Sequence, residues 1–473
     1  MHEKKPNILL ITIDCGRQDM IYGDEVETPH IDKLREGGIT FTNAFSQSSS
    51  TIPSLYSLFT SKYLSTHGVI NQNPAMYKRI GNDSLPVILA RNKWSVGMFS
   101  GLDILQRVML SDIINCITGK RDFSYIVKEA NQETKARSFL KNKARSLNHV
   151  IPPIIKAHYA RNLNMSAKTN AETLVDNASM WLSRLNEDNF FLWIHFFDAH
   201  LLYWAPDKWI KKYYQKPRPL PKKTAYEHAK VKGLWFNEIT MDSILKRTKD
   251  MNIFPATYKA ALSYIDEQIG RLKASLRETK KYEDTLIVIT ADHGENLLEN
   301  GIFCGHNKLF DATTKIPLII RDPNFFQSRE VSALVQHIDL MPTLLERLKV
   351  NLPREIDGKS LWPCINSEKE VNEFVFSEHT NMFQKTIRNK EWQYLWANTD
   401  KKPLLGPEFE GGILLNRLKG DKENYATRYP AICKEMEDMI HKLSEGFQPA
   451  DEKEGEVPQE MLDQLKALGY FDL

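Results

Sequence analysis

Two apolar stretches that lie far apart in the chain each end in an acidic residue, and this pattern constrains the fold most. The first is 7–13, followed by Asp14, and the second is 285–291, followed by Asp292 and His293. Both are rich in β-branched residues and show no alternation, which is typical of central strands buried on both faces of an α/β sheet. We therefore expect two interior strands, each with an acid at its carboxyl end.

Strand and helix patterns alternate along most of the chain. Further buried strands are expected at 190–197, 316–320 and 95–99. Apolar residues at helical spacing predict helices over 170–186 and 258–276. This alternation predicts a layered α/β/α domain.

The pattern changes after about residue 370. This change predicts a large α/β/α domain, 1–370, and a small α+β subdomain, 371–473, of short strands and one helix. The expected strands are 374–377, 385–396 and 412–418, and the expected helix is 429–443.

Composition is that of an ordinary globular protein. The 473 residues include 63 Lys and Arg against 60 Asp and Glu, so the charge balance gives no reason to expect a nucleic-acid partner. The five cysteines are scattered without a CxxC pair, which suits a reducing compartment. No stretch approaches the ~20 apolar residues of a membrane helix. We predict a cytoplasmic protein, and its oligomeric state stays open.

Two insertions near 102–168 and 205–251 break the charge balance. Residues 134–171 contain eight basic and no acidic residues, and a second basic run covers 208–223. These segments are either solvated insertions or a positive rim that attracts a polyanionic substrate or a membrane surface. Peripheral membrane contact therefore stays open.

The acids at the strand ends are candidates for chemistry. Ligand sites of open α/β sheets lie beyond the carboxyl ends of the strands, so Asp14, Asp292 and His293 are expected to meet there. Two carboxylates and an imidazole are suitable ligands for a divalent metal ion. The alternative is that each aspartate only caps the helix that follows it.

Thr51 is the candidate nucleophile. Pro53 indicates the first turn of a helix, and Thr51 stands in the capping position before it. Its hydroxyl would face the positive end of the helix dipole, which favours an alkoxide and an incoming anion. If it also touches the metal, it becomes an activated nucleophile; otherwise it is a plain N-cap.

A set of motifs extends along nearly the whole chain: 6–14, 28–34, 38–44, 51–69, 190–200, 258–272, 290–295, 316–320, 337–345, 357–361 and 465–470. In this order they resemble the sulfatase branch of the alkaline phosphatase superfamily. This resemblance implies an α/β/α sandwich with a large mixed central sheet and a small C-terminal subdomain. It also implies that Asp14, Asp292 and His293 are metal ligands and that Thr51 occupies the nucleophile position.

The resemblance implies roles for further residues. His200 matches a histidine that contacts the transferred group or protonates the leaving oxygen. His306 stands where relatives place a Lys or His on the same group, and Lys308 is a neighbouring candidate; a purely structural role stays open for the histidines. His195 and Asp198 fit less well, although with His200 and His306 they could build a second metal site.

Three departures from the family pattern change the expected chemistry. Sulfatases carry Cys or Ser, oxidised to formylglycine, where this chain has Thr51, so no formylglycine is expected. Leu55 replaces the Arg on which that modification relies, and Cys15 replaces an aspartate ligand. The pattern is similar to phosphodiesterases and phosphotransferases with a Thr nucleophile, which favours Mn²⁺ or Zn²⁺, with Ca²⁺ as an alternative.

The sequence therefore predicts a metal-dependent hydrolase that cleaves a phosphoester, with a phosphodiester favoured, through a covalent intermediate on Thr51. The expected substrate is an anionic small molecule, a glycan or a lipid head group. Three alternatives stay open: a phosphotransferase that uses a glycan or lipid acceptor, a sulfuric ester hydrolase, and a non-catalytic binding module.

Overall fold

The computed structural model describes most of the chain outside the two insertions and the tail. The described residues are 5–70, 81–102, 113, 170–185, 189–201, 203–215, 250–300, 302–306, 308–325, 327–367, 369–379, 384–398, 412–418 and 423–444. Most of both predicted basic insertions and the 465–470 motif lie outside this part of the chain.

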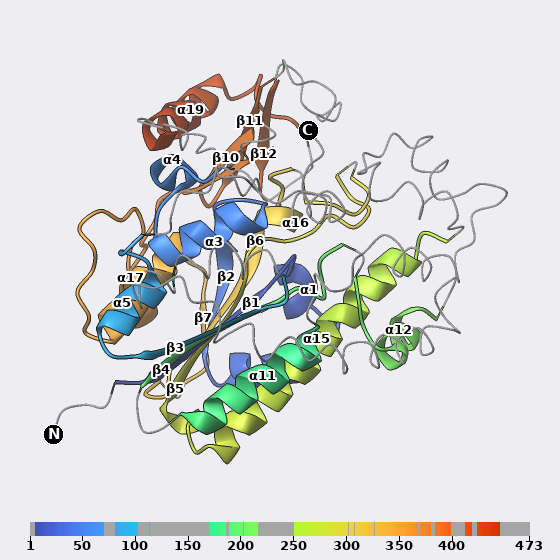
Figure 1. The fold of residues 1–473 in the computed structure, drawn as a ribbon. Helices are drawn as coiled ribbons and strands as arrows, with labels where there is room; N and C mark the ends of the chain where they lie inside the picture. The colour runs from blue at the N-terminus through green and yellow to red at the C-terminus, as the bar shows by residue number, and fades with distance from the viewer. Residues whose placement is uncertain are drawn as a thin grey trace, which may run out of the picture.

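A large mixed sheet forms the centre of the molecule (Figure 1). Its strand order is β3-β4-β1-β5-β6-β2-β7, and β8 pairs with β2. The strands are β1 (Asn7–Ile13), β2 (Ile39–Phe45), β3 (Ser95–Ser100), β4 (Phe190–Phe196), β5 (Thr285–Ala291), β6 (Lys315–Arg321), β7 (Arg329–Val331) and β8 (Val335–Gln336). The predicted fold class is confirmed.

The central strands run parallel and are buried along their whole length. Strand β1 pairs in parallel with β4 on one side and β5 on the other, and β6 then joins β5 antiparallel. Every residue of β1, β4 and β5 is buried. Burial on both faces explains why these strands are continuously apolar.

Helices cover both faces of this sheet (Figure 1). Helices α2, α11, α12 and α15 pack together, and α3 contacts α4, α5 and α17. The helices are α1 (Gln18–Tyr22), α2 (Pro29–Glu36), α3 (Thr51–Thr60), α4 (Leu64–His67), α5 (Leu85–Arg91), α11 (Ala171–Arg184), α12 (Asp207–Tyr213), α15 (Ile253–Glu278), α16 (Asp311–Thr314), α17 (Leu340–Arg347) and α18 (Trp362–Ser367). The apolar periodicity found α11 but missed the first turn of α15.

A second, antiparallel sheet lies at the C-terminal side, in the order β12-β11-β10-β9. Its elements are β9 (Val375–His379), β10 (Gln384–Arg388), β11 (Trp392–Ala397), β12 (Ile413–Arg417) and α19 (Pro430–Ser444). The single stretch expected at 385–396 is two strands, because the Asn389 side chain accepts the backbone N–H groups of Glu391 and Trp392 and forms a turn.

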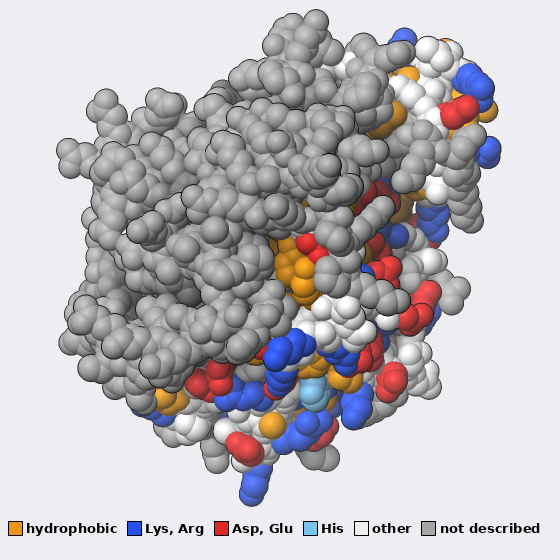
Figure 2. All heavy atoms as spheres, turned by 90° about the vertical axis from the view of Figure 1, so that its right-hand side faces the viewer, with side chains coloured by type: hydrophobic (Ala, Val, Ile, Leu, Met, Phe, Trp, Pro, Cys, Tyr) orange, Lys and Arg blue, Asp and Glu red, His pale blue; other side chains and the backbone are white. Residues whose placement is uncertain are grey.

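The described surface mixes charges of both signs. Figure 2 shows blue and red side chains interspersed on one face. Lys208 and Lys212, in the second basic run, form ion pairs with Glu267 and Glu27. These two lysines therefore belong to a solvated, paired surface rather than to a positive rim. None of the described helices combines the length and apolar character needed to cross a bilayer.

Asp266 on α15 fastens α2 to the rest of the domain. Its carboxylate accepts the backbone N–H groups of His30 and Ile31 at 3.1 and 2.8 Å, in the first turn of α2. Burial raises the pKa of Asp266 to about 7, against the opposing effect of these two hydrogen bonds. In the unfolded chain the same carboxyl titrates near 3.8.

We therefore expect Asp266→Asn to alter the pH dependence of stability. Because the folded-state pKa is the higher one, the contribution of Asp266 is fully present below about pH 4 and is lost as pH rises toward 7. The cost of Asp266→Asn in free energy of unfolding should shrink by about 2 kcal/mol between pH 5 and pH 8. Urea titrations at both values test this, with exposed Asp176→Asn as control. An equal cost at both values would contradict it.

Candidate active site

The register of three neighbouring strands assembles the site. Ile13 at the end of β1 pairs with Ala291 at the end of β5, so the next residues, Asp14 and Asp292, emerge side by side. Both carboxylates are fully buried, and His293 lies with them. The His293 Nε2 atom is 3.4 Å from Asp292 Oδ2 and 3.9 Å from Asp14 Oδ1. The structure thus brings the three predicted ligands together.

Thr51 points into the same cluster. Its hydroxyl is 3.4 Å from Asp14 Oδ2 and 3.2 Å from His293 Nε2. The capping position belongs to Ser50, and Thr51 is the first residue of α3, which differs by one position from the expectation. The Ser54 hydroxyl, one turn on, donates to the Asp292 backbone carbonyl at 2.5 Å and holds the helix start over the strand end.

The orientation of His293 suits a metal ligand. Its Nδ1 atom lies 2.8 Å from the Gly294 carbonyl oxygen, so this nitrogen carries the proton and donates. Nε2 is then left with a lone pair that faces Thr51 and the two carboxylates. A backbone carbonyl that fixes the tautomer in this way is typical of metal-binding histidines.

His195 contacts Asp14, and the sequence did not predict this contact. It is buried in β4, which pairs with β1 on the side opposite β5, and its Nε2 lies 3.3 Å from Asp14 Oδ2. The Thr12 hydroxyl accepts from Trp193 Nε1 at 3.0 Å and lies 2.8 Å from His195 Nδ1. Because the Thr12 hydroxyl accepts from Trp193, it donates to His195 Nδ1, and the ring proton of His195 therefore lies on Nε2 and faces Asp14. His195 thus orients the Asp14 carboxylate rather than replacing it as a ligand.

The two carboxylates experience opposite electrostatic environments. Burial alone raises the pKa of Asp14, but the surrounding histidines, His200 first, outweigh it and hold that pKa below its ordinary value. Burial and then the Asp14 charge raise the pKa of Asp292 well above its ordinary value. Each of these two adjacent buried carboxylates disfavours ionisation of the other, as is typical of a pair that binds a cation.

The donor set fits a divalent cation. Asp14 Oδ1 and Asp292 Oδ2 are both buried without a hydrogen-bond partner. Buried carboxylate oxygens in that state are costly unless a cation binds them. Asp14, Asp292, His293 Nε2 and the Thr51 hydroxyl would together offer oxygen and nitrogen ligands, which fit Mn²⁺ or Zn²⁺.

A second group of histidines adjoins this cluster. The His306 ring lies close to the rings of both His293 and His200, with centroid distances of 4.5 and 5.5 Å. His200 is buried and stacks on Phe197. Lys308 is also buried, and its ammonium lies 5.8 Å from the ring centre of Phe310. The two predicted histidines therefore do reach the strand-end cluster.

Asp198 has a different place from the one considered for it. Its Oδ2 atom accepts the backbone N–H of Ala171 at 3.0 Å, at the start of α11, and its backbone carbonyl accepts the N–H of Trp204. Its carboxylate therefore caps a helix. His195 contacts Asp14, and Asp198 caps α11. The second metal site expected from His195, Asp198, His200 and His306 is therefore not formed in this arrangement.

Two further buried histidines near the site were given no role from the sequence, although His337 begins the matching segment 337–345. His337 lies 3.3 Å from both the Ser54 hydroxyl and the Thr290 hydroxyl. His379 comes from the C-terminal sheet, and its Nε2 lies 3.3 Å from the Ser50 hydroxyl. His337 therefore connects α3 to the central sheet, and His379 connects the start of α3 to the second sheet. Only the packing of the second sheet against Ser50 shows that His379 belongs here.

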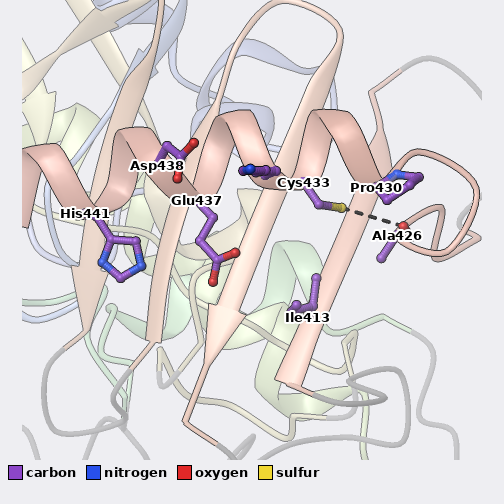
Figure 3. A pocket seen from close by; sticks show the side chains of 8 residues that line it. Ile413, Ala426, Pro430, Cys433, Glu437, Asp438 and His441 are labelled. Atoms are coloured by element: carbon purple, nitrogen blue, oxygen red, sulfur yellow. Dashed lines mark hydrogen bonds between the residues drawn. The ribbon is translucent and has the colours of Figure 1, made fainter.

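A separate pocket lies between α19 and β12 (Figure 3). Cys433 lines it, with its sulfur 3.8 Å from the Ala426 carbonyl oxygen. Glu437 and His441 follow on successive turns of α19. None of its lining residues belongs to the strand-end cluster, so it offers no competing catalytic site.

Comparison with known proteins agrees with this geometry. The profile described as sulfatase matches residues 6–350, so the chain belongs to the sulfatase family. A sulfatase from Formosa agariphila is 27% identical over 385 residues, covering 76% of this chain and 72% of the relative.

Solved structures show the same fold. A phosphonate monoester hydrolase from Silicibacter pomeroyi superimposes with a TM-score of 0.68 at 20% identity, covering 94% of this chain and 96% of the other. The protein BT4656, in complex with its substrate D-glucosamine-2-N,6-O-disulfate, gives 0.67 at 17% identity, covering 95% of this chain and all of the other.

Because Asp14 and Asp292 repel each other, replacing Asp292 should affect the free energy of unfolding differently without metal and with metal. Without metal, Asp292→Asn should raise the free energy of unfolding, since it removes a buried carboxyl beside Asp14 while keeping the oxygen that accepts from Cys15 and His293. With Zn²⁺ or Mn²⁺ at about 100 times Kd, the wild type should gain about 2.7 kcal/mol and the variant much less.

Thermal unfolding with chelator and with metal measures both effects. Asp339→Asn is the matched control, because buried Asp339 accepts N–H groups from Gln336 and Lys359 and from the side chain of Asn372. The loss of stability caused by Asp339→Asn should be equal with chelator and with metal. Destabilisation of the metal-free protein by Asp292→Asn would show that the site is not built around a cation.

Proposed function

We propose that the chain is a metal-dependent hydrolase that cleaves a phosphoester, with a diester as the favoured substrate, through a covalent ester on Thr51. The observation that carries this proposal is the position of the Thr51 hydroxyl: it is buried, lies at the N-terminus of α3, and is within 3.4 Å of Asp14 and His293. A plain capping residue would point its oxygen back at the helix N–H groups.

Asp14, Asp292 and His293 would hold the cation. When bound, it supplies a positive charge that acidifies a hydroxyl and balances negative charge on the transferred group. The N-terminus of α3 adds the positive end of a ten-residue helix. His195 keeps Asp14 oriented toward the cluster.

The reaction has two displacements. The Thr51 hydroxyl donates to Asp14 Oδ2, which orients Oγ1 for in-line attack on phosphorus. Its proton passes to solvent as the bond forms, while His306 and Lys308 hold the non-bridging oxygens. His200 donates a proton to the alcohol oxygen as the bond from phosphorus to that oxygen breaks. Water then attacks the phosphorus of the Thr51 ester and gives a proton to His200, which lost its own in the first step. The bond from phosphorus to Thr51 Oγ1 breaks, and this oxygen takes up a proton from solvent.

The identity of residue 51 favours phosphorus over sulfur. A formylglycine hydrate can expel sulfate by elimination, whereas an ester on threonine must be attacked a second time at the central atom. Thr51 cannot form the aldehyde, and Leu55, on the next turn, is fully buried and apolar. The similarity in fold to a phosphonate monoester hydrolase is compatible with a phosphorus substrate.

Hydrolysis of a sulfuric ester is the second candidate. The Formosa agariphila relative is named a sulfatase, and the substrate of BT4656 is a sulfated sugar. An anionic glycan is therefore a reasonable substrate class for either reaction.

An activity panel tests the proposal. Metal-loaded protein is assayed against aryl phosphate monoester, phosphodiester, phosphonate ester and sulfate ester, for the wild type, Thr51→Ala and Thr51→Ser. Thr51→Ala should lower kcat by about 10³-fold or more, and Thr51→Ser should retain measurable turnover because it keeps the hydroxyl. Thr60→Ala, at the far end of the same helix, is the control and should leave kcat unchanged.

The outcomes separate the candidates. Full turnover by Thr51→Ala would remove the nucleophile assignment. A higher kcat/KM for the sulfate ester than for every phosphorus ester would replace the proposal by the second candidate. Transfer of the phosphorus-containing group to added glycerol, at the expense of the product formed with water, would identify a phosphotransferase.

A further inference from the structure

Cys15 is held in an unusual backbone conformation directly beside the cluster. It follows Asp14 at the end of β1 with φ of 59°, in the left-handed region that non-glycine residues seldom adopt. Tyr258 donates its hydroxyl to the Cys15 carbonyl at 2.7 Å, and the Cys15 N–H donates to Asp292 Oδ1 at 3.3 Å. The position of the thiol is therefore imposed by its surroundings.

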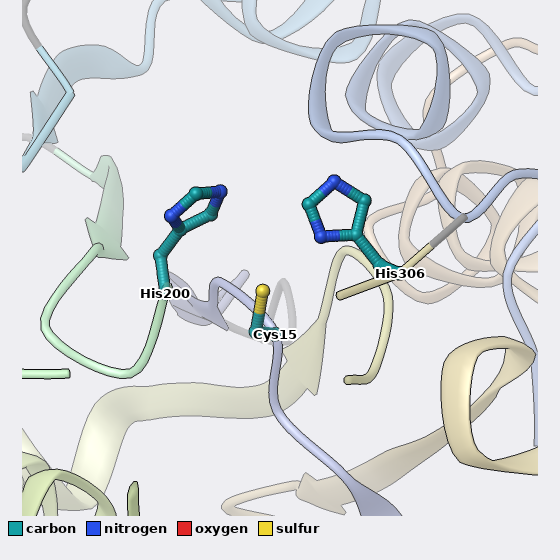
Figure 4. Close-up of side chains that lie close together, drawn as sticks. All are labelled: Cys15, His200 and His306. Atoms are coloured by element: carbon teal, nitrogen blue, oxygen red, sulfur yellow. The ribbon is translucent and has the colours of Figure 1, made fainter. Parts of the chain in front are cut away.

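The thiol shares a small volume with two imidazoles. The Cys15 sulfur and one nitrogen each of His200 and His306 all lie within 4.8 Å of one another. Figure 4 shows the sulfur directed toward the space between the two rings. His306 Nδ1 is buried without a hydrogen-bond partner, which is costly for an imidazole nitrogen unless a ligand engages it.

We infer that Cys15, His200 and His306 form a second, softer metal site beside the one at Asp14, Asp292 and His293. One thiolate and two imidazoles, with a fourth position left for substrate or water, are a donor set typical of Zn²⁺ and unsuited to Ca²⁺ or Mg²⁺. Cys15 is thus a ligand of a different kind from the aspartate that it replaces.

The two sites adjoin each other. The Cys15 sulfur also lies within 4.8 Å of ligand atoms of Asp14 and His293. The structure therefore offers a harder site of carboxylates and one imidazole next to a softer site of sulfur and two imidazoles. Binding of an ion at the softer site requires the Cys15 thiol to release its proton.

The inference rests on the site of the proposed function and changes two roles within it, those of His200 and His306. A His306 imidazole that binds an ion no longer holds the non-bridging oxygens directly. An imidazole that binds an ion cannot also protonate the leaving oxygen, so His200 acts as the proton donor only in the form without the second ion. The roles of Thr51, Asp14 and Asp292 are unaffected.

Metal content and the spectrum of the cobalt-substituted protein test the inference without any activity measurement. Full-length wild-type protein equilibrated with Zn²⁺ should hold two ions per chain, and Cys15→Ser and His306→Ala should each hold one. With Co²⁺, the wild type should show a near-ultraviolet thiolate charge-transfer band that both variants lack. Cys364→Ser and His441→Ala, which change residues outside the site, should match the wild type.

Each outcome is decisive. One ion per chain in the wild type would overturn the inference. A thiolate band that persists in His306→Ala would also overturn it, because Cys15 would then serve the first site alone. Thr51→Ala should keep the thiolate band, so failure of the nucleophile assignment and failure of the second metal site are separate results.

Discussion

The parallel pairing of β1 with both β4 and β5 is the constraint on which the whole site depends. Because the side-chain direction in a strand alternates with a period of two, a slip of one residue would turn Asp14 or Asp292 away from its partner. The register holds because all three strands are apolar and buried on both faces, so a slip would disrupt the packing along their whole length. The hydrophobic core thus fixes the geometry of the polar site.

That geometry is expensive in the absence of a cation. Asp14 and Asp292 each have a buried oxygen without a hydrogen-bond partner, and the pKa of Asp292 is raised by burial and by the Asp14 charge. Burial of the large apolar core around the strand ends, and contacts such as that of His195 with Asp14, offset this unfavourable free energy. Such a local conflict within an otherwise consistent fold is expected at a functional site.

The buried strands, the acids at their ends and the candidate threonine could be predicted from the sequence, because each carries a local signal. An apolar run followed by an acid identified β1 and β5, and Pro53 located the start of α3. The resemblance to a family added His200 and His306. The two sheets and their order follow from long-range pairing, which residue patterns alone do not encode.

The roles of His195 and His379 could not be predicted, because they depend on tertiary placement. His195 lies within an apolar strand, and only the pairing of β4 with β1 shows that it reaches Asp14. His379 stands about 330 positions from Ser50 and meets it because the second sheet packs against the start of α3.

Cys15 illustrates the limit most clearly. Cys15 stands where the family pattern has an aspartate, so the sequence alone suggests that a hard oxygen ligand has been lost from the metal site. In three dimensions its left-handed backbone directs the sulfur toward the space between His200 and His306. The same substitution that weakens one site for calcium therefore supplies a soft donor to another. Under the proposed function and the inferred second site, Cys15 and Thr51 together favour zinc and a phosphorus ester over calcium and a sulfate ester.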